Sequence, residues 1–255
     1  MKRISAILPS LLLAILILAG WEAACRITGV AVYLLPPPSA IWAAMVENLP
    51  ILLQSALVTL SMAAQALAAA LVVATPLALA GALSPLFQRA TGPLAAAIQV
   101  TPVVAIAPLF VIWAGLDHPD RAITALGAIV AFFPIFSGLS TGLRAADPDL
   151  QRLFDLYGAT RLQRLIRLSA PSAIPYLVEG IKVAAGLSII GVVVAEFVAG
   201  SGGSQGLAWR ILEAEHQLKT AQMFAALVVL GLLGAALNGL LTVGERRLLK
   251  TWRGR

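Results

Sequence analysis

Few side chains in this sequence could do chemistry. Asp117-His118-Pro119-Asp120 places two carboxylates and an imidazole side by side, a set that could bind a cation or transfer protons. Proline and polar residues are equally typical of a tight turn, and we favour a turn between two apolar segments over a metal or catalytic site. The single cysteine, Cys25, excludes a cysteine cluster, and the two histidines disfavour a multi-histidine metal site.

Glu196 is the second candidate, because it lies in an otherwise apolar run, residues 189–198. A charge inside a membrane segment is costly and commonly functional. Its carboxylate could reach water at the end of the segment, form a hydrogen bond to another segment, or bind a ligand. We expect the second, with hydrogen bonds to backbone or polar groups of the neighbouring loops. Glu179 and Lys182, three positions apart, are expected to form a local ion pair.

Gln99, Thr101 and Pro102 introduce polarity and a helix irregularity into another apolar segment. Non-helical backbone at membrane depth is tolerated where it lines a cavity, so these residues are candidates for a cavity lining. A glutamine paired with a neighbouring helix would explain Gln99 equally well.

These candidates must be positioned by membrane helices. Hydrophobic residues make up 60% of the chain and charged residues 12%, far from the composition of a soluble domain. A helix needs about 20 apolar residues to cross the hydrocarbon core. The sequence predicts an all-α membrane protein with six transmembrane helices, at Ile4–Ala24, Ala56–Leu83, Pro93–Leu116, Ala122–Leu143, Tyr176–Ala199 and Ala221–Gly244. Alanines and glycines between Ala63 and Ala82 are expected at close helix contacts.

Basic residues give the orientation. With both termini in the cytoplasm, 14 of the 18 lysines and arginines lie on the cytoplasmic side, as the positive-inside rule requires. The basic excess therefore needs no nucleic-acid partner. The first apolar segment could be a cleaved signal peptide, but its length and the sequence around Trp21 favour retention. Outside, a short helix is expected to begin at Ser39, after three prolines.

The longest cytoplasmic connection contains a polar segment, residues 147–171. Asp147-Pro148 predicts a helix start, Gly158 a left-handed helix end, and Thr160 with Gln163 a capping box that opens a second helix. Pro171 and Pro175 are expected to end that second helix near Ser169. The two short helices could lie on the membrane with basic side chains on lipid phosphates, or dock into a partner. The basic residues are Arg161, Arg164 and Arg167, and the apolar stripe is Leu150, Leu153, Phe154 and Tyr157.

This segment resembles a known family. Gly158-Ala159, followed by Leu168, Pro171 and Pro175, is similar to the "EAA" loop of ABC importer permeases. Other stretches look like the branch that carries nitrate, sulfonates and taurine, and also pyrimidine vitamin precursors and flavins: Leu35-Pro36-Pro37-Pro38-Ser39, Pro102 with Pro108-Leu109, and Val194-Ala195-Glu196-Phe197. The chain departs from the family where Arg152-Leu153-Phe154 replaces Glu-Ala-Ala and where Ala170-Pro171 replaces Leu-Pro. Asp155 could supply the missing acidic contact.

The resemblance implies a type I ABC importer permease fold with a cytoplasmic coupling helix, formed by residues 1–255 as a single domain of the bacterial inner membrane. It further implies a second copy of the chain, two ATP-binding subunits and an extracytoplasmic solute-binding protein, working by alternating access. The residues expected to couple to the ATPase are Arg152, Leu153, Phe154, Asp155, Tyr157, Gly158, Ala159, Arg161 and Pro171. In such a transporter Gln99, Thr101 and Pro102 are expected to lie on the translocation path, and Glu196 is expected to close the outer gate. The substrate would be a small solute: a sulfonate, taurine, nitrate, or a pyrimidine or flavin vitamin or precursor.

No nucleotide or other cofactor is expected on this chain. A phosphate-binding P-loop needs Gly-Lys-Ser/Thr, and none of the four lysines follows a glycine, so ATP and Mg²⁺ would be bound by the partner ATPase. An ion-coupled secondary transporter is the alternative, although paired broken helices and an internal repeat are not evident. An intramembrane hydrolase would need a nucleophile or an acid–base pair, which Glu196 alone does not make.

Overall fold

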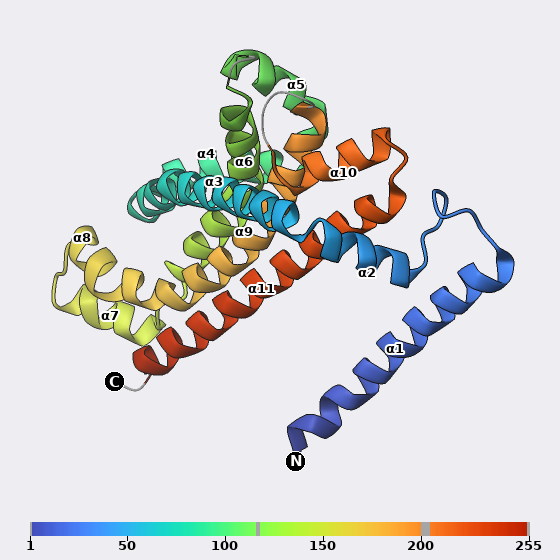
Figure 1. Ribbon diagram of the computed structural model, residues 1–255. Coiled ribbons are helices and arrows are strands. Elements are labelled where there is room, and N and C mark those ends of the chain that lie inside the picture. The colour runs from blue at the N-terminus through green and yellow to red at the C-terminus, as the bar shows by residue number, and fades with distance from the viewer. Residues whose placement is uncertain (1, 116–117, 200–204, 254–255) are drawn as a thin grey trace. The chain divides into compact units, whose positions relative to one another are not determined.

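A computed structural model describes residues 2–115, 118–199 and 205–253, and these residues form helices joined by turns and short loops (Figure 1). The helices are α1 (Lys2–Thr28), α2 (Pro38–Glu47), α3 (Leu49–Leu83), α4 (Pro85–Val100), α5 (Val103–Ala114), α6 (Pro119–Gly142), α7 (Pro148–Leu156), α8 (Arg161–Arg164), the π-helical turn η1 (Leu165–Ser169), α9 (Ala170–Ala199), α10 (Leu207–His216) and α11 (Thr220–Arg253). The all-helical prediction is confirmed.

Four helical stretches among the described residues are long and apolar enough to cross a membrane: Leu49–Leu83, Pro119–Gly142, Arg161–Ala199 and Thr220–Lys250. A fifth is gained if α4 and α5, bent by 98° at the break between them, count as one broken span. The predicted span Pro93–Leu116 is therefore not a straight helix. The total of six spans stays a prediction.

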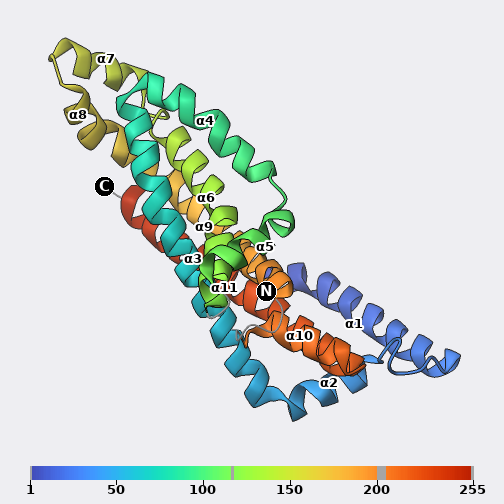
Figure 2. The same cartoon turned by 90° about the horizontal axis from the view of Figure 1, so that it is seen from above.

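The chain divides into two compact units, Met1–Ala56 with Gln205–Gly231, and Leu57–Ser204 with Leu232–Arg255. In the second unit α6 and α9 lie side by side, with α4 beside α6 (Figure 2). A Cβ atom added to Gly180 of α9 would stand 2.8 Å from the Pro134 carbonyl oxygen of α6. The backbones thus approach so closely that only glycine fits. Fully buried Ile135 and Ala184 extend this contact.

Helix α3 contributes a stripe of small side chains to the same core. Ala70, Ala74 and Ala78 recur every four residues and are at most 2% exposed. This spacing places them on one face of the helix, as expected for the alanine-rich sequence. Large apolar side chains on other faces remain exposed in the single chain, among them Leu57 (67%) and Val72 (74%). In a membrane, lipid or a second subunit would cover them.

In the first unit, the N-terminus of α2 is bound by a carboxylate from α1. Glu22 accepts hydrogen bonds from the Ser39 backbone N–H (3.0 Å) and the Ser39 hydroxyl (2.8 Å), and it pairs with Arg26. The helix begins at Pro38 with Pro37 in the capping position, so the predicted start at Ser39 is wrong by one residue. The fixed φ of proline suits the first helical position, and because Pro37 offers no capping side chain, the Glu22 carboxylate accepts from the Ser39 N–H in its place.

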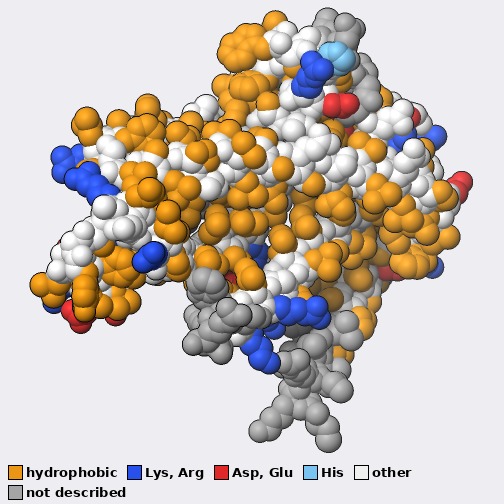
Figure 3. Space-filling view, turned by 90° about the vertical axis from the view of Figure 1, so that its left-hand side faces the viewer, with side chains coloured by type: hydrophobic (Ala, Val, Ile, Leu, Met, Phe, Trp, Pro, Cys, Tyr) orange, Lys and Arg blue, Asp and Glu red, His pale blue; other side chains and the backbone are white. Residues whose placement is uncertain are grey.

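Hydrophobic side chains cover most of the face shown in Figure 3, and charged side chains stand on it in small separate groups. This surface suits a lipid environment, because polar side chains would be costly against hydrocarbon.

Candidate functional site

The segment between α6 and α9 contains the two predicted short helices, α7 and α8, and the turn at residues 157–160 that joins them is called the corner below. Asp147 caps α7, its carboxylate accepting from the Asp149 backbone N–H at 2.8 Å, and Pro148 occupies the first helical position. The helix ends at Leu156 as a complete C-terminal motif: the N–H of Gly158 donates to the Asp155 carbonyl and that of Ala159 to the Phe154 carbonyl, both at 3.0 Å. Gly158 has φ +62°, so the predicted left-handed helix end is confirmed.

The second helix starts with the predicted capping box. The Thr160 hydroxyl accepts from the Gln163 N–H at 3.2 Å, and the Gln163 side chain accepts from the Thr160 N–H at 2.9 Å. Two reciprocal hydrogen bonds therefore fix the direction of the chain directly after the glycine. In Figure 1, α7 and α8 lie next to each other on either side of this corner.

The expected end of the second helix near Ser169 is wrong. Helix α8 runs through η1 into α9, so residues 161–199 are one helical stretch. Proline disrupts a helix because it lacks an N–H and clashes with the carbonyl four residues earlier. Just before Pro171 the backbone widens into a π-helical turn, in which the Ala170 N–H donates to the Leu165 carbonyl, five residues back. The wider turn accommodates the proline without ending the helix.

One ion pair joins the two helices at the corner. Arg164 of α8 pairs with Asp155 of α7, so Asp155 is engaged within the chain rather than left for a partner. Arg152 pairs with Asp149 at 3.0 Å, where both side chains are exposed. Arg161 donates to the Leu83 carbonyl at the end of α3 at 3.3 Å. Arg164 and Arg161 thus position the corner, a role that the lipid interpretation of these arginines did not include.

An apolar surface remains exposed on α7 and the corner. Tyr157 is 83% exposed, Leu156 84% and Leu153 44%, whereas Phe154 is half-buried. Exposed aromatic and leucine side chains held on a rigid turn are well suited to fill a groove in another protein. Pro171 and Ala159, also predicted to take part, are half-buried.

The four predicted path residues lie in different surroundings. Thr101 follows the last residue of α4 as its C-cap, and Pro102 precedes α5, which confirms the helix irregularity at this point. Both residues and Gln99 are exposed in the single chain. Glu196 is only 1% exposed, which argues against a carboxylate that reaches water at the outer end of the helix.

Glu179 and Lys182 form the predicted ion pair at 2.9 Å, but Lys182 also contacts Glu245 at 2.9 Å. Glu245 lies 63 positions along the chain on α11, and no local pattern in the sequence could have indicated this second partner. The Asp117 cluster cannot be placed in full, since Asp117 lies outside the described residues. Within the described part of the chain, no group of three or more metal-ligating side chains is present.

Comparison with known proteins supports the resemblance noted in the corner. The family described as "Binding-protein-dependent transport system inner membrane component" matches residues 74–250. A solved structure described as an amino acid ABC transporter with histidines has a TM-score of 0.68 and 14% identity, covering 80% of this chain and 97% of that one. At this identity the likeness shows the fold alone.

Curated relatives align over shorter stretches. A putative aliphatic sulfonates transport permease, SsuC of Bacillus subtilis, is 27% identical over 47% of this chain and 42% of its own length. The formylaminopyrimidine transport permease ThiX of Halalkalibacterium halodurans is 32% identical over 36% of each chain. The nitrate import permease NrtB of Leptolyngbya laminosa is 26% identical over 42% of this chain and 37% of its own. The aligned stretches thus cover less than half of these relatives.

The family match extends over more than half of the chain and includes the whole corner. Its members are permeases, transport subunits rather than enzymes, of the inner membrane. This chain belongs to the family of binding-protein-dependent transport system inner membrane components, that is, to the ABC importer permeases.

Proposed function

We propose that this chain forms the transmembrane path of an ABC importer and carries a small solute into the cytoplasm by alternating access. The observation that supports this most directly is the corner at Gly158, where a C-terminal helix motif and a capping box hold exposed Tyr157 and Leu156 outward. The corner would insert into a cleft of a cytoplasmic ATPase subunit. Its rigidity matters because a flexible contact could not transmit the movement of the ATPase to the membrane helices.

Energy for transport comes from the partner, which binds ATP and Mg²⁺. When two ATPase subunits close on ATP, the corners are displaced, and the helical stretch of residues 161–199 moves with them, because it continues from α8 without a break. We place both termini in the cytoplasm and two copies of the chain in the transporter. A solute-binding protein delivers substrate at the outer loops.

Coupling would involve the corner and the surface beside it, namely Arg152, Leu153, Phe154, Asp155, Tyr157, Gly158, Ala159, Arg161 and Pro171. Among these, exposed Tyr157 and Leu153 would bury apolar area in the ATPase. Asp155 and Arg161 would act within the chain by holding the corner, as their partners Arg164 and the Leu83 carbonyl indicate.

The path would involve the break at Thr101 and Pro102, with Gln99 beside it, and Glu196 would stabilise the outer gate. If Glu196 serves as a hydrogen-bonding group, Glu196→Gln should retain most uptake, because an amide can still accept a hydrogen bond and is nearly isosteric. Glu196→Ala should uncouple ATP hydrolysis from the solute-binding protein. Loss of uptake in both variants with normal stimulated hydrolysis would instead place Glu196 in the substrate path.

Co-purification tests the function itself. The tagged chain should bring an ATPase subunit with it from native membranes, and Tyr157→Asp should abolish this association by placing a charge in the docking contact. Leu218→Asp is the matched control, since Leu218 is similarly exposed (72%) and falls in a predicted outer loop. Absence of any ATPase from the wild-type preparation, or equal recovery with Tyr157→Asp, would refute the proposal.

A further inference from the structure

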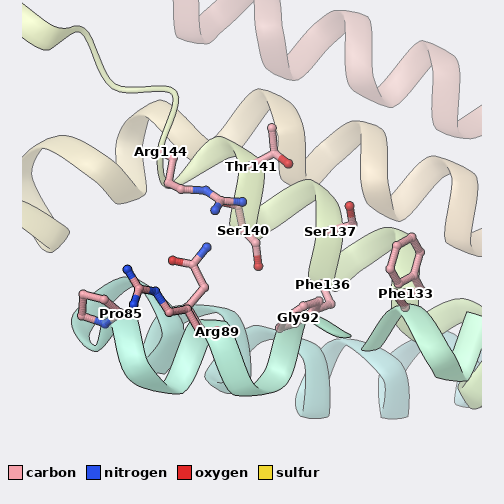
Figure 4. A pocket seen from close by; sticks show the side chains of 11 residues that line it. Pro85, Arg89, Gly92, Phe133, Phe136, Ser137, Ser140, Thr141 and Arg144 are labelled. Atoms are coloured by element: carbon pink, nitrogen blue, oxygen red, sulfur yellow. The ribbon is translucent and has the colours of Figure 1, made fainter. Parts of the chain in front are cut away.

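A cavity of about 620 Å³ lies between α4 and α6 and is lined almost entirely by side chains from these helices (Figure 4). This volume falls in the range of small-molecule sites, about 300–1,000 Å³. The lining residues are Pro85, Gln88, Arg89, Gly92, Ala96, Phe133, Phe136, Ser137, Ser140, Thr141 and Arg144. None of the residues predicted to form the path is among them.

The charged side chains that line the cavity are both basic. Arg89 from α4 and Arg144, which follows α6 after one residue, both extend into the cavity in Figure 4, and no aspartate or glutamate is among the described residues that line it. Neither guanidinium has an ion pair with a described carboxylate. Two cations sharing one cavity repel each other, and an anion between them would remove the repulsion.

Hydrogen-bond donors accompany the charges. Ser137, Ser140 and Thr141 are spaced as i, i+3 and i+4, so they form one polar stripe on a helix that is otherwise largely apolar, and Arg144 follows in the turn after this helix. The Arg144 Nε donates to the Ser140 carbonyl at 3.1 Å, which orients the guanidinium while its terminal nitrogens remain available. Phe133 and Phe136 supply apolar walls.

We propose that this cavity binds an oxyanion group, with Arg89 and Arg144 as its charged ligands and the serine and threonine hydroxyls as additional donors. Planar guanidinium groups bind the paired oxygens of sulfonate, nitrate or phosphate by two parallel hydrogen bonds, and hydroxyls add to this without requiring a charge. The oxyanion could belong to a transported solute or to a phospholipid headgroup. If it is a solute, the site narrows the substrate class to small oxyanions, a conclusion that rests on the proposed function.

Protection from phenylglyoxal, which modifies arginine, tests the site on the full-length chain in lipid-free detergent. Methanesulfonate or nitrate should slow modification of Arg89 and Arg144, by about tenfold at ten times the dissociation constant, because the unoccupied fraction falls accordingly. Chloride at equal ionic strength should protect much less. Arg167, which is exposed and lines no part of this cavity, should keep its rate with the same anions. Mass spectrometry reads each arginine separately.

Two variants localise the effect. Ala96→Phe should fill part of the cavity and remove protection of Arg144, and Arg89→Gln should weaken it, since one of two charged ligands is lost. A second arm compares nanodiscs of phosphatidylglycerol with nanodiscs of phosphatidylcholine. Protection by free anions in detergent assigns the site to a solute, and protection by phosphatidylglycerol alone assigns it to a lipid headgroup.

The proposal fails if neither anions nor phosphatidylglycerol protect the two arginines. It also fails if protection is undiminished in Ala96→Phe, or if methanesulfonate protects Arg167 equally. Co-purification of the ATPase is measured on the same variants. A chain that retains its ATPase but shows no protection refutes the oxyanion site alone, whereas a chain that lacks the ATPase and still shows protection refutes the proposed importer function alone.

Discussion

Substitution of Gly158 is the sharpest test of the corner, because it strains the backbone at this position without any side-chain clash. The residue has φ +62°, and a Cβ atom added there would meet nothing within 4 Å. A substitution therefore costs only the backbone strain of the left-handed conformation, about 1–2 kcal/mol for an ordinary residue. Asparagine tolerates this conformation better than alanine, and valine tolerates it least.

This strain acts on two hydrogen bonds at once. If the backbone leaves the left-handed region, the bonds from Gly158 to Asp155 and from Ala159 to Phe154 are lost together. A cost of 1–2 kcal/mol changes an equilibrium by a factor of about 5–30. Because binding weakens in proportion to the population of the competent conformation, ATPase affinity should fall by up to that factor. The expected order of affinity is glycine, asparagine, alanine, valine.

The dissociation constant for the purified ATPase subunit, measured by titration against each variant in nanodiscs, checks this order. Gly186→Val is the control, since Gly186 lies in α9 and an added Cβ would also meet nothing within 4 Å there. That variant should bind as the wild type does. Wild-type affinity in Gly158→Val, with thermal unfolding that shows a folded chain, would refute the role of the corner. An asparagine variant as weak as the valine variant would refute the backbone explanation.

Two further predictions concern the membrane helices. Gly180→Ala should destabilise the chain by about 1–3 kcal/mol through overpacking, since the added Cβ would stand 2.8 Å from the Pro134 oxygen. Gly186→Ala, where an added Cβ would meet nothing within 4 Å, should be neutral or stabilising. Thermal unfolding in detergent compares the two variants, and equal melting temperatures would contradict the close approach of the two helices. Glu245→Gln should lower the melting temperature more than Glu179→Gln, because the Glu245 side chain is 18% exposed and the Glu179 side chain 54%. Water therefore replaces the ion pair of Lys182 with Glu245 less well than the ion pair with Glu179. The reverse order of melting temperatures would show that the ion pair of Lys182 with Glu245 contributes little.

Local patterns in the sequence determined the corner almost completely. Asp147, Gly158, and Thr160 with Gln163 act through hydrogen bonds to backbone groups within five residues, so each could be predicted without knowing the fold. The same holds for the family resemblance, whose residues lie in several short stretches that can each be read without the fold, and for the membrane-protein class, which follows from composition. The predicted end of the second helix was wrong because a π-helical turn, which no residue pattern predicts, accommodates Pro171.

Tertiary structure decided everything that depends on separate segments meeting. The pairing of Lys182 with Glu245, the burial of Glu196 and the binding of Ser39 by Glu22 each depend on how segments pack. The cavity between α4 and α6 illustrates the difference between what a sequence pattern predicts and what helix packing decides. Its polar stripe is visible in the sequence at helical spacing, but an isolated stripe could face a partner or water. Only the packing of α4 against α6 brings Arg89 opposite that stripe and turns dispersed donors into one cavity, because a binding site is a property of shape as well as of residue type.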